Sequence, residues 1–239
     1  MAKATAINES LVEKNPHDSV LRQGLLHTYL QSSQLYEEVN DPLSFEILHK
    51  ALKLSEELMA SDAANTQARQ NLAKTYSKLG TISVRLKKLG EAVYYLERAA
   101  ATFAELEGND PRNGTYRHDI GRVFTYLGLA KYEQRDFTRA LAWYEKAAEV
   151  FETAARADAK NTFSRRKLAG VYTYIGDAHR DWARRGQNHH THRQAAKENY
   201  QRALDIFLQL QAQNALAEFD RKYLEEVQAA VRKYEEGQK

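Results

Sequence analysis

The chain has 239 residues, of which 43% are hydrophobic and 28% are charged. With 3 prolines and 11 glycines it is neither collagen-like nor simply disordered, and its apolar content is enough for a buried core. The absence of cysteine excludes disulfides, thiolate metal sites and cysteine nucleophiles. The net charge of +3 is small beside 35 basic and 32 acidic side chains, so no strongly polyanionic partner is implied.

The distribution of apolar residues indicates no membrane partner. No apolar run approaches the ~20 residues that a membrane span needs. The first fifteen residues scatter charges among small side chains and lack the apolar core of a signal peptide. We therefore expect a cytoplasmic location.

Residue types and spacing indicate helices throughout. Pro16, Pro42 and Pro111 are the only prolines, and each stands where a helix would have to begin again. The stretches between them are rich in Ala, Leu, Glu, Lys, Arg and Gln, which are strong helix formers. Apolar residues recur at steps of three and four, and no stretch alternates with a period of two. The sequence therefore predicts an all-α fold.

An internal repeat divides the chain. Positions 80, 128 and 176 carry glycine at steps of 48 residues, and the first copy follows a step of 47. The last copy contains eight extra residues, which we place within the segment 184–193. We expect a single domain over 1–239, a right-handed α-solenoid of four helix pairs with a C-terminal capping helix. In chain order its parts are a partial leading helix at 1–15, repeats at 16–61, 62–109, 110–157 and 158–213, and the capping helix at 214–239.

Two kinds of repeated residue predict how each pair is built. The linkers have the form Asp-x-x-Asn, and their asparagines can accept a hydrogen bond from a free N–H at the start of the next helix. The repeated glycines fall inside the first helix of each pair, where glycine costs roughly 1 kcal/mol against alanine, so a close approach of the second helix is expected to offset that cost. The linker asparagines are Asn65, Asn113 and Asn161, and the glycines are Gly80, Gly128 and Gly176.

The two ends of the chain differ. Ala4, Ile7 and Leu11 fall on apolar positions of the next second helix when shifted by 47, so residues 1–14 are expected to resemble the end of such a helix. The segment 215–236 has one apolar and one polar side, as a capping helix of a solenoid needs. Its apolar side would carry Leu216, Phe219, Tyr223, Leu224, Val227 and Val231, and its polar side Asp220, Arg221, Lys222, Glu226, Arg232 and Lys233.

The segment from Gly128 to Ala147, with Phe124 and Leu127 before it, resembles a tetratricopeptide repeat. The resemblance covers residues 17–213. The family's usual unit has about 34 residues, so helices longer by about two turns each are expected here. The resemblance implies that the first helix of each pair lines a concave groove in which a peptide or a partner helix binds.

The length of the unit and a recurrent arginine near its start also resemble the repeats behind the kinase domain of some bacterial serine/threonine kinases. The sequence has no Gly-rich phosphate loop, and although His179-Arg180-Asp181 matches a catalytic-loop tripeptide, Gly186 stands where that loop needs an asparagine. A regulatory or dimerisation segment of a larger signalling protein, with a second copy as partner, is therefore an alternative function.

Carrying the family's groove positions over to this sequence gives candidate binding residues. Lys74, Lys78 and Arg122 would form a basic group suited to a peptide carboxylate or an acidic side chain, with tyrosines as apolar anchors; a solvated charged face is the alternative interpretation. The candidates are His27, Gln31, Lys74, Lys78, Arg122, Tyr126, Tyr132, Tyr174 and Arg180.

Four arginines, Arg22, Arg69, Arg117 and Arg165, occupy one repeat position. They could form a ladder that binds phosphates. We favour a structural role in which each arginine reaches a linker aspartate or a carbonyl at the end of the preceding helix.

The segment 184–193 contains His189, His190 and His192. Imidazoles bind zinc, copper and nickel, but a structural site usually needs four ligands and no cysteine is available. We interpret the segment as a polar loop, with a metal site and a partner contact as alternatives.

No enzyme motif was found. The sequence has no His-Glu-x-x-His pair, Walker loop, Gly-x-Ser-x-Gly elbow or Cys-His pair, and we expect neither catalysis nor a cofactor. Acidic Glu37, Glu38, Glu133 and Asp177 argue against a second alternative, an RNA-binding helical array. The sequence thus predicts a scaffold that binds a protein or peptide partner.

Overall fold

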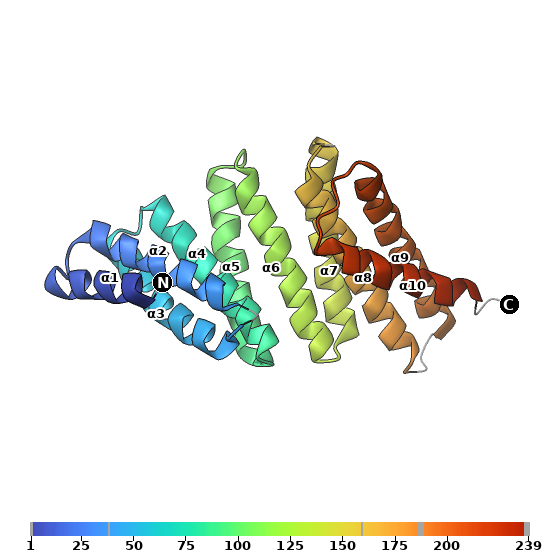
Figure 1. Cartoon of the computed structure of the whole chain (residues 1–239), viewed down its shortest axis with the longest axis horizontal. Helices are drawn as coiled ribbons and strands as arrows, with labels where there is room; N and C mark the ends of the chain where they lie inside the picture. The colour runs from blue at the N-terminus through green and yellow to red at the C-terminus, as the bar shows by residue number, and fades with distance from the viewer. Residues whose placement is uncertain (1, 38, 159, 186–188, 237–239) are drawn as a thin grey trace. The chain divides into compact units, whose positions relative to one another are not determined.

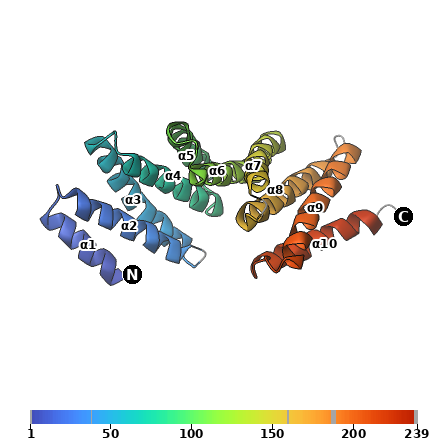
Figure 2. The same cartoon turned by 90° about the horizontal axis from the view of Figure 1, so that it is seen from above.

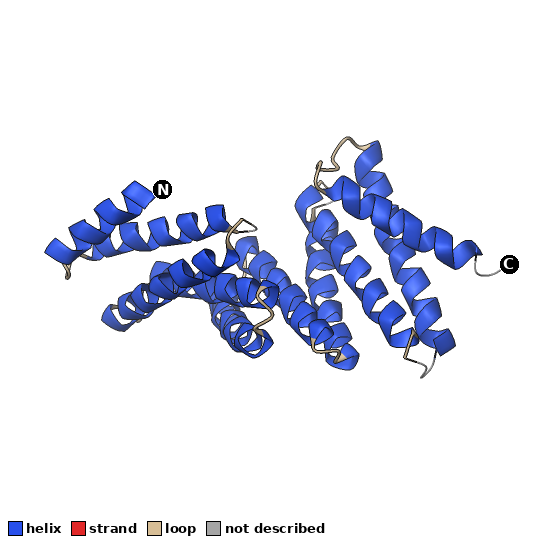
Figure 3. Cartoon of the chain, turned by 60° about the horizontal axis from the view of Figure 1, so that its bottom comes forward, coloured by secondary structure: helices blue, strands red, loops and turns tan. Residues whose placement is uncertain are grey.

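The computed structural model describes residues 2–37, 39–158, 160–185 and 189–236. Within these ranges the chain forms α-helices joined by short turns and no strand, as Figures 1 and 3 show, which confirms the all-α prediction. The helices are α1 (Ala2–Lys14), α2 (Ser19–Tyr36), α3 (Asp41–Ser61), α4 (Thr66–Arg85), α5 (Leu89–Asn109), α6 (Gly114–Glu133), α7 (Phe137–Ala157), α8 (Thr162–Ala183), α9 (His189–Ala212) and α10 (Asp220–Glu236).

The chain divides into two compact units, residues 1–116 (unit 1) and 117–239 (unit 2). Unit 1 holds α1 to α5, and unit 2 holds most of α6 together with α7 to α10. Within each unit consecutive helices lie side by side as hairpins (Figure 2). We call α2, α4, α6 and α8 the A helices and α3, α5, α7 and α9 the B helices. The single continuous domain and its handedness stay predictions.

In unit 1, α1 contacts α2 through the same kind of hydrogen bond that joins α3 to α4. The Tyr29 hydroxyl on α2 donates to Glu9 on α1 over 2.7 Å, and the Tyr76 hydroxyl on α4 donates to Glu56 on α3 over 3.1 Å. Glu9 and Tyr29 precede Glu56 and Tyr76 by the same 47 residues. The leading helix therefore pairs in the way expected of a B helix.

In unit 2, α10 packs like one more A helix. Asp220 forms an ion pair with Arg166 of α8, and the corresponding residues one repeat earlier, Ser164 and His118, lie 3.2 Å apart. Apolar residues of α10, including Leu224, are buried in the core of this unit. This helix begins at Asp220 and caps the unit through the packing of a repeat.

Part of the expected division of the capping segment into two sides was wrong. Asp220, expected on the polar side, is 6% exposed, because its carboxylate is neutralised by Arg166. Phe219 and Tyr223, expected on the apolar side, are 65% and 42% exposed. Phe219 lies just before the helix, where its ring is covered by the Arg166 guanidinium at 4.4 Å. A three- and four-residue spacing does not distinguish a buried ion pair from a solvated charge.

The repeated glycines mark the close contact between the two helices of a pair. A Cβ atom on Gly80 would lie 2.7 Å from Leu96 Cδ2, and one on Gly176 would lie 2.7 Å from Tyr200 Cε1. Gly128 meets Tyr144 in the same way. The prediction of close helix approach is confirmed.

The linker asparagines cap the A helices as expected. The Asn65 side chain accepts a hydrogen bond from the Ala68 N–H at 3.0 Å, and Asn161 accepts one from the Ser164 N–H at 2.9 Å. Asn113 accepts one from the Thr115 N–H at 3.2 Å. Each of these bonds satisfies a donor that a helix start leaves free.

Three of the four recurrent arginines, Arg22, Arg69 and Arg165, bond within their own repeat, but most of their expected partners were wrong. Arg22 pairs with Glu57 at 2.7 Å and Arg69 with Glu105 at 3.5 Å, while Arg165 donates to Gln209 at 3.1 Å. These partners lie near the end of the B helix of the same repeat, because an antiparallel hairpin brings that end beside the start of its A helix. Arg69 also donates to the Ala63 carbonyl at 2.9 Å, which lies in the linker just beyond the end of the preceding helix.

Candidate functional site

In unit 1 the candidate groove residues lie on two neighbouring A helices. His27 and Gln31 are exposed on α2, while Lys74 and Lys78 are half-buried on α4. The Lys78 ammonium lies 3.4 Å from Glu37. Among the described residues no carboxylate lies within 4.0 Å of the Lys74 ammonium. This face is polar, and Lys74 contributes its uncompensated charge.

In unit 2 the corresponding face carries three tyrosines, each from a different helix. Tyr126 of α6 and Tyr174 of α8 are half-buried, and Tyr223 of α10 is exposed. The Tyr174 ring stacks on the buried Tyr144 ring with their centroids 5.7 Å apart. Burial raises the pKa of the Tyr174 hydroxyl, and the nearby hydroxyls of Tyr223 and Tyr126 raise it further. We call Tyr126, Tyr174 and Tyr223 the tyrosine face.

Cations lie near this face within unit 2. Arg122 pairs with Asp119, one turn earlier on α6, at 3.1 Å. The Lys167 residue is exposed, but the groups packed around its ammonium partly desolvate it and lower its pKa, and the neighbouring charges of Arg166 and Arg122 lower it further. Lys74 and Lys78 belong to unit 1, so their predicted grouping with Arg122 stays a prediction. Within unit 2, Lys167 has Arg122 and Arg166 as basic neighbours.

Tyr132 and Arg180 take part in a network of partly buried polar side chains. The Tyr132 hydroxyl donates to Asp181 over 2.5 Å, and Arg180 donates to Asp181 over 3.0 Å. Arg180 also binds Asp177 and donates to the Tyr200 hydroxyl at 2.8 Å. Burial raises the pKa of Asp177. Against the effect of burial, hydrogen bonds from Tyr132 and Arg180 hold the pKa of Asp181 below its ordinary value.

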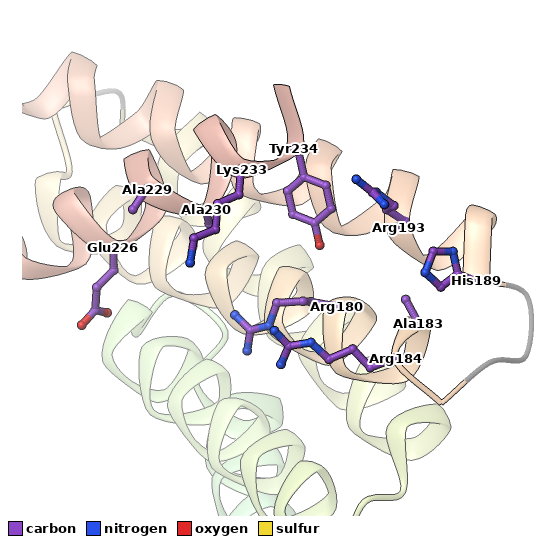
Figure 4. Close-up of a pocket in the computed structure, with 10 residues that line it drawn as sticks. All are labelled: Arg180, Ala183, Arg184, His189, Arg193, Glu226, Ala229, Ala230, Lys233 and Tyr234. Atoms are coloured by element: carbon purple, nitrogen blue, oxygen red, sulfur yellow. The ribbon is translucent and has the colours of Figure 1, made fainter. Parts of the chain in front are cut away.

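Arg180 also lines a cleft of about 490 Å³ between α8, α9 and α10, which we call the C-terminal cleft. Figure 4 shows Arg180 and Arg184 of α8 side by side, with Tyr234 of α10 pointing its hydroxyl toward them. Arg193 of α9 lies on the other side of Tyr234, with its guanidinium 5.8 Å from the ring centroid. Lys233 adds an ammonium from α10.

The histidines of the segment 184–193 contribute to helix packing, and the expected polar loop was partly wrong. Residues 189–193 form the start of α9, and residues 186–188 lie outside the described residues, as does Glu38. The Nδ1 atoms of His192 and His179 lie 3.0 Å apart, and the His192 ring stacks on Trp182 at a centroid distance of 4.1 Å.

His189 and His190 are exposed. No three His, Asp or Glu side chains in the described part of the chain come together in a way that could hold a metal ion.

The tyrosine face and the C-terminal cleft both depend on residues of α10 that the sequence analysis did not propose as a site. The step of 56 residues that relates the second helix of the fourth repeat to that of the third could have revealed these residues. Applied once more, it maps Asp177 of α8 onto Lys233. Treating 214–239 only as a cap concealed this correspondence.

The chain is a TPR-like helical repeat protein, and residues 122–155 match the family model of the tetratricopeptide repeat. The crystal structure of BtubC (BKLC) from P. vanneervenii has a similar fold, with a TM-score of 0.60 at 17% sequence identity over 98% of this chain and 87% of that chain. The de novo designed helical repeat protein DHR64 aligns over 98% of this chain and 96% of its own, with 14% identity and a TM-score of 0.30.

Among curated proteins none matches the chain in sequence. Within the described residues no helix has both the length and the apolar character needed to cross a bilayer.

Proposed function

We propose that this chain is a protein-interaction scaffold that binds a segment of a partner protein on its A-helix faces and performs no catalysis. The tyrosine face is the observation that carries the proposal. A tyrosine has only two side-chain torsions, so it gives a large contact area with little loss of conformational entropy on binding. Tyr174 is held further by its stack on Tyr144.

The neighbouring charges support a partner segment with acidic side chains or a free carboxylate. Arg166 and Arg122 lie near Lys167 in unit 2. Lys74 supplies a cation on the A-helix face of unit 1, where Lys78, His27 and Gln31 are neighbouring candidates. Charge-assisted hydrogen bonds from such groups orient a carboxylate. Aromatic anchors would therefore supply affinity, and the cations would supply direction.

Tyr132 and Arg180 would act behind the contact surface in this proposal. Their bonds to Asp181 and Asp177 fix the surface of α8 next to Tyr174. A preorganised surface loses less entropy when a partner binds.

The proposal is tested by selecting binders from a random peptide library on the wild type and measuring their affinity for a Tyr126→Ala/Tyr223→Ala variant. We expect the affinity to fall at least tenfold, because each truncation removes an aromatic anchor. Tyr94→Ala is the matched control, since Tyr94 is 51% exposed on a B helix and its loss should leave the affinity unchanged. Equal affinity of all three proteins would contradict the proposal.

The charged candidates are tested on the same peptides. Lys74→Glu and Lys167→Glu should each weaken acidic peptides more than neutral ones and reduce the salt dependence of binding. Salt-sensitive binding of random RNA with no peptide selected would favour the nucleic-acid alternative, and a mass that rises with concentration in light scattering would favour self-association.

A further inference from the structure

The C-terminal cleft brings cationic groups from three helices around one hydroxyl group. Burial raises the pKa of Tyr234, while the guanidinium groups of Arg180, Arg193 and Arg184 oppose this shift, so all three lie close enough to influence the phenol. Figure 4 shows the three arginines on two sides of Tyr234. Lys233 of α10 also lines the cleft and adds an ammonium group.

Not all of this charge is neutralised by the protein. Arg180 is bound by Asp177 and Asp181, and Arg184 lies 3.2 Å from Asp181. For Arg193 and Lys233, no carboxylate of the residues from 2–37, 39–158, 160–185 and 189–236 lies within 4.0 Å. The cleft thus combines two oriented guanidinium groups with two uncompensated cations.

Glu226 is the acidic residue among those that line the cleft. Its carboxylate lies 3.8 Å from the Lys222 ammonium, and in Figure 4 it stands at the edge, away from Arg193. Small side chains, those of Ala183, Ala229 and Ala230, leave the space between the cations open. An anion can therefore enter without displacing a large side chain.

We propose that the C-terminal cleft binds a phosphate monoester. A carboxylate has two oxygens in a plane and is satisfied by one arginine fork, whereas a phosphate presents three acceptor oxygens in three dimensions. Donors that come from α8, α9 and α10 and surround a volume match the second arrangement. The phenol of Tyr234 can donate as well, and the volume leaves room for the group that carries the phosphate.

The ester could be a phosphorylated side chain of a protein segment or a small free phosphate compound. The proposal does not depend on binding at the tyrosine face, because Arg193, Lys233 and Tyr234 are not part of that face.

The test uses the full chain and isothermal titration calorimetry with three probes. They are a capped pentapeptide with a central phosphoserine between alanines, the same peptide with glutamate in its place, and inorganic phosphate. We expect the phosphoserine peptide to bind in a saturable way and at least tenfold more tightly than the glutamate peptide. Equal or tighter binding of inorganic phosphate would support the site and indicate a small phosphate compound as the natural ligand.

The variant Arg193→Ala/Lys233→Ala should weaken phosphate binding at least tenfold, because it removes the two uncompensated cations. Arg221→Ala/Lys146→Ala removes the same charge from α10 and α7 outside the cleft and serves as the control. Circular dichroism melting curves show whether each variant is folded. A Tyr126→Ala/Tyr223→Ala variant should keep its phosphate affinity, which separates this site from the tyrosine face.

Three results would overturn the proposal. They are a glutamate peptide that binds as tightly as the tighter of the two phosphate probes, no binding of either phosphate probe, and equal phosphate affinity of a folded Arg193→Ala/Lys233→Ala variant and the wild type.

Discussion

The A-helix faces of the two units differ in chemistry although the helix pairs beneath them are built alike. In unit 1 the face carries His27, Gln31, Lys74 and Lys78, and no aromatic residue was proposed there. In unit 2 it carries Tyr126, Tyr174 and, through α10, Tyr223. The positions that hold the pairs together repeat in both units, whereas the positions on the A-helix faces do not. This difference indicates that packing constrains one set of positions and leaves the other available for recognition.

The largest difference between the two units is expected when the buried ion pair between α10 and α8 is broken and the result is compared with the loss of an exposed pair in unit 1. Arg166→Met should lower the free energy of unfolding of unit 2 by about 2–4 kcal/mol, because it leaves the Asp220 carboxylate buried without its cation. Arg22→Met in unit 1 removes a pair whose Glu57 side chain is 48% exposed and should cost less than about 1 kcal/mol. Urea denaturation measures both.

Adding Asp220→Leu to Arg166→Met removes the buried charge and should restore most of the lost stability. A double variant as unstable as the single one would show that α10 is not held by this pair.

The repeated glycines should differ in effect from a glycine that faces open space. Gly128→Ala should destabilise unit 2 by about 2 kcal/mol, since the new Cβ atom would overlap the Tyr144 ring, which is 1% exposed. Gly24→Ala in unit 1 is the control, because its Cβ atom meets open space and helix propensity should stabilise that helix by up to about 1 kcal/mol. We expect the melting temperature to fall for Gly128→Ala and to rise for Gly24→Ala. A change of the same sign in both variants would contradict this account of the glycines.

A pH effect should follow from the histidine pair of unit 2. Burial, with the neighbouring His192, lowers the pKa of His179 to about 4. The unfolded chain binds a proton on this residue near its ordinary pKa of about 6.5, so the stabilising contribution is complete above that pH and is lost as the pH falls toward 4. Because His179 is partly exposed, we expect a loss of about 1–2 kcal/mol.

Urea denaturation at several pH values between 4 and 7 measures this loss, and His179→Gln should flatten the profile. Hydrogen exchange should show the acid-induced opening in α8 and α9. If His179→Gln showed the same dependence of stability on pH as the wild type, the pH dependence would come from other groups.

The smallest effect concerns the tyrosine–glutamate bond that recurs in both units. Tyr29→Phe in unit 1 and Tyr172→Phe in unit 2 should each lower stability by about 1 kcal/mol, the usual net value of one hydrogen bond. The bond does not recur in the repeat before Glu152 and Tyr172, where Ala104 and Phe124 take the two corresponding positions. Differential scanning calorimetry at neutral pH measures the changes, and a loss above about 3 kcal/mol would mean that the ring packing, and not the bond, had been disturbed.

Much of the fold was predictable because the constraints that build it are local and recur along the chain. Asn65, Asn113 and Asn161 identified the helix starts, and the glycine spacing identified the close helix contacts, since each depends on neighbouring backbone geometry. Arg22, Arg69 and Arg165 were correctly expected to make structural contacts. Most of their expected partners were wrong, because the acceptors on the B helix are brought near by the hairpin and not by sequence proximity.

Less of the candidate sites was predictable. Tyr126, Tyr174 and Arg180 were proposed from the family's groove positions. Tyr223, Lys167 and Lys233 were not. The histidine segment was interpreted as a polar loop, and this interpretation missed the stack of His192 on Trp182. Each missed feature depends on contacts between residues on different helices.

The amino-acid order by itself determined that this protein is a series of helix pairs, because helix periods, caps and glycine contacts act over short distances and repeat along the chain. The tertiary structure alone decided which charges are compensated and which remain available. Asp220 is buried beside Arg166, whereas Arg193 and Lys233 face a cleft. The physical reason is that the cost of a charge depends on the groups packed around it, and those come from helices far apart in the sequence.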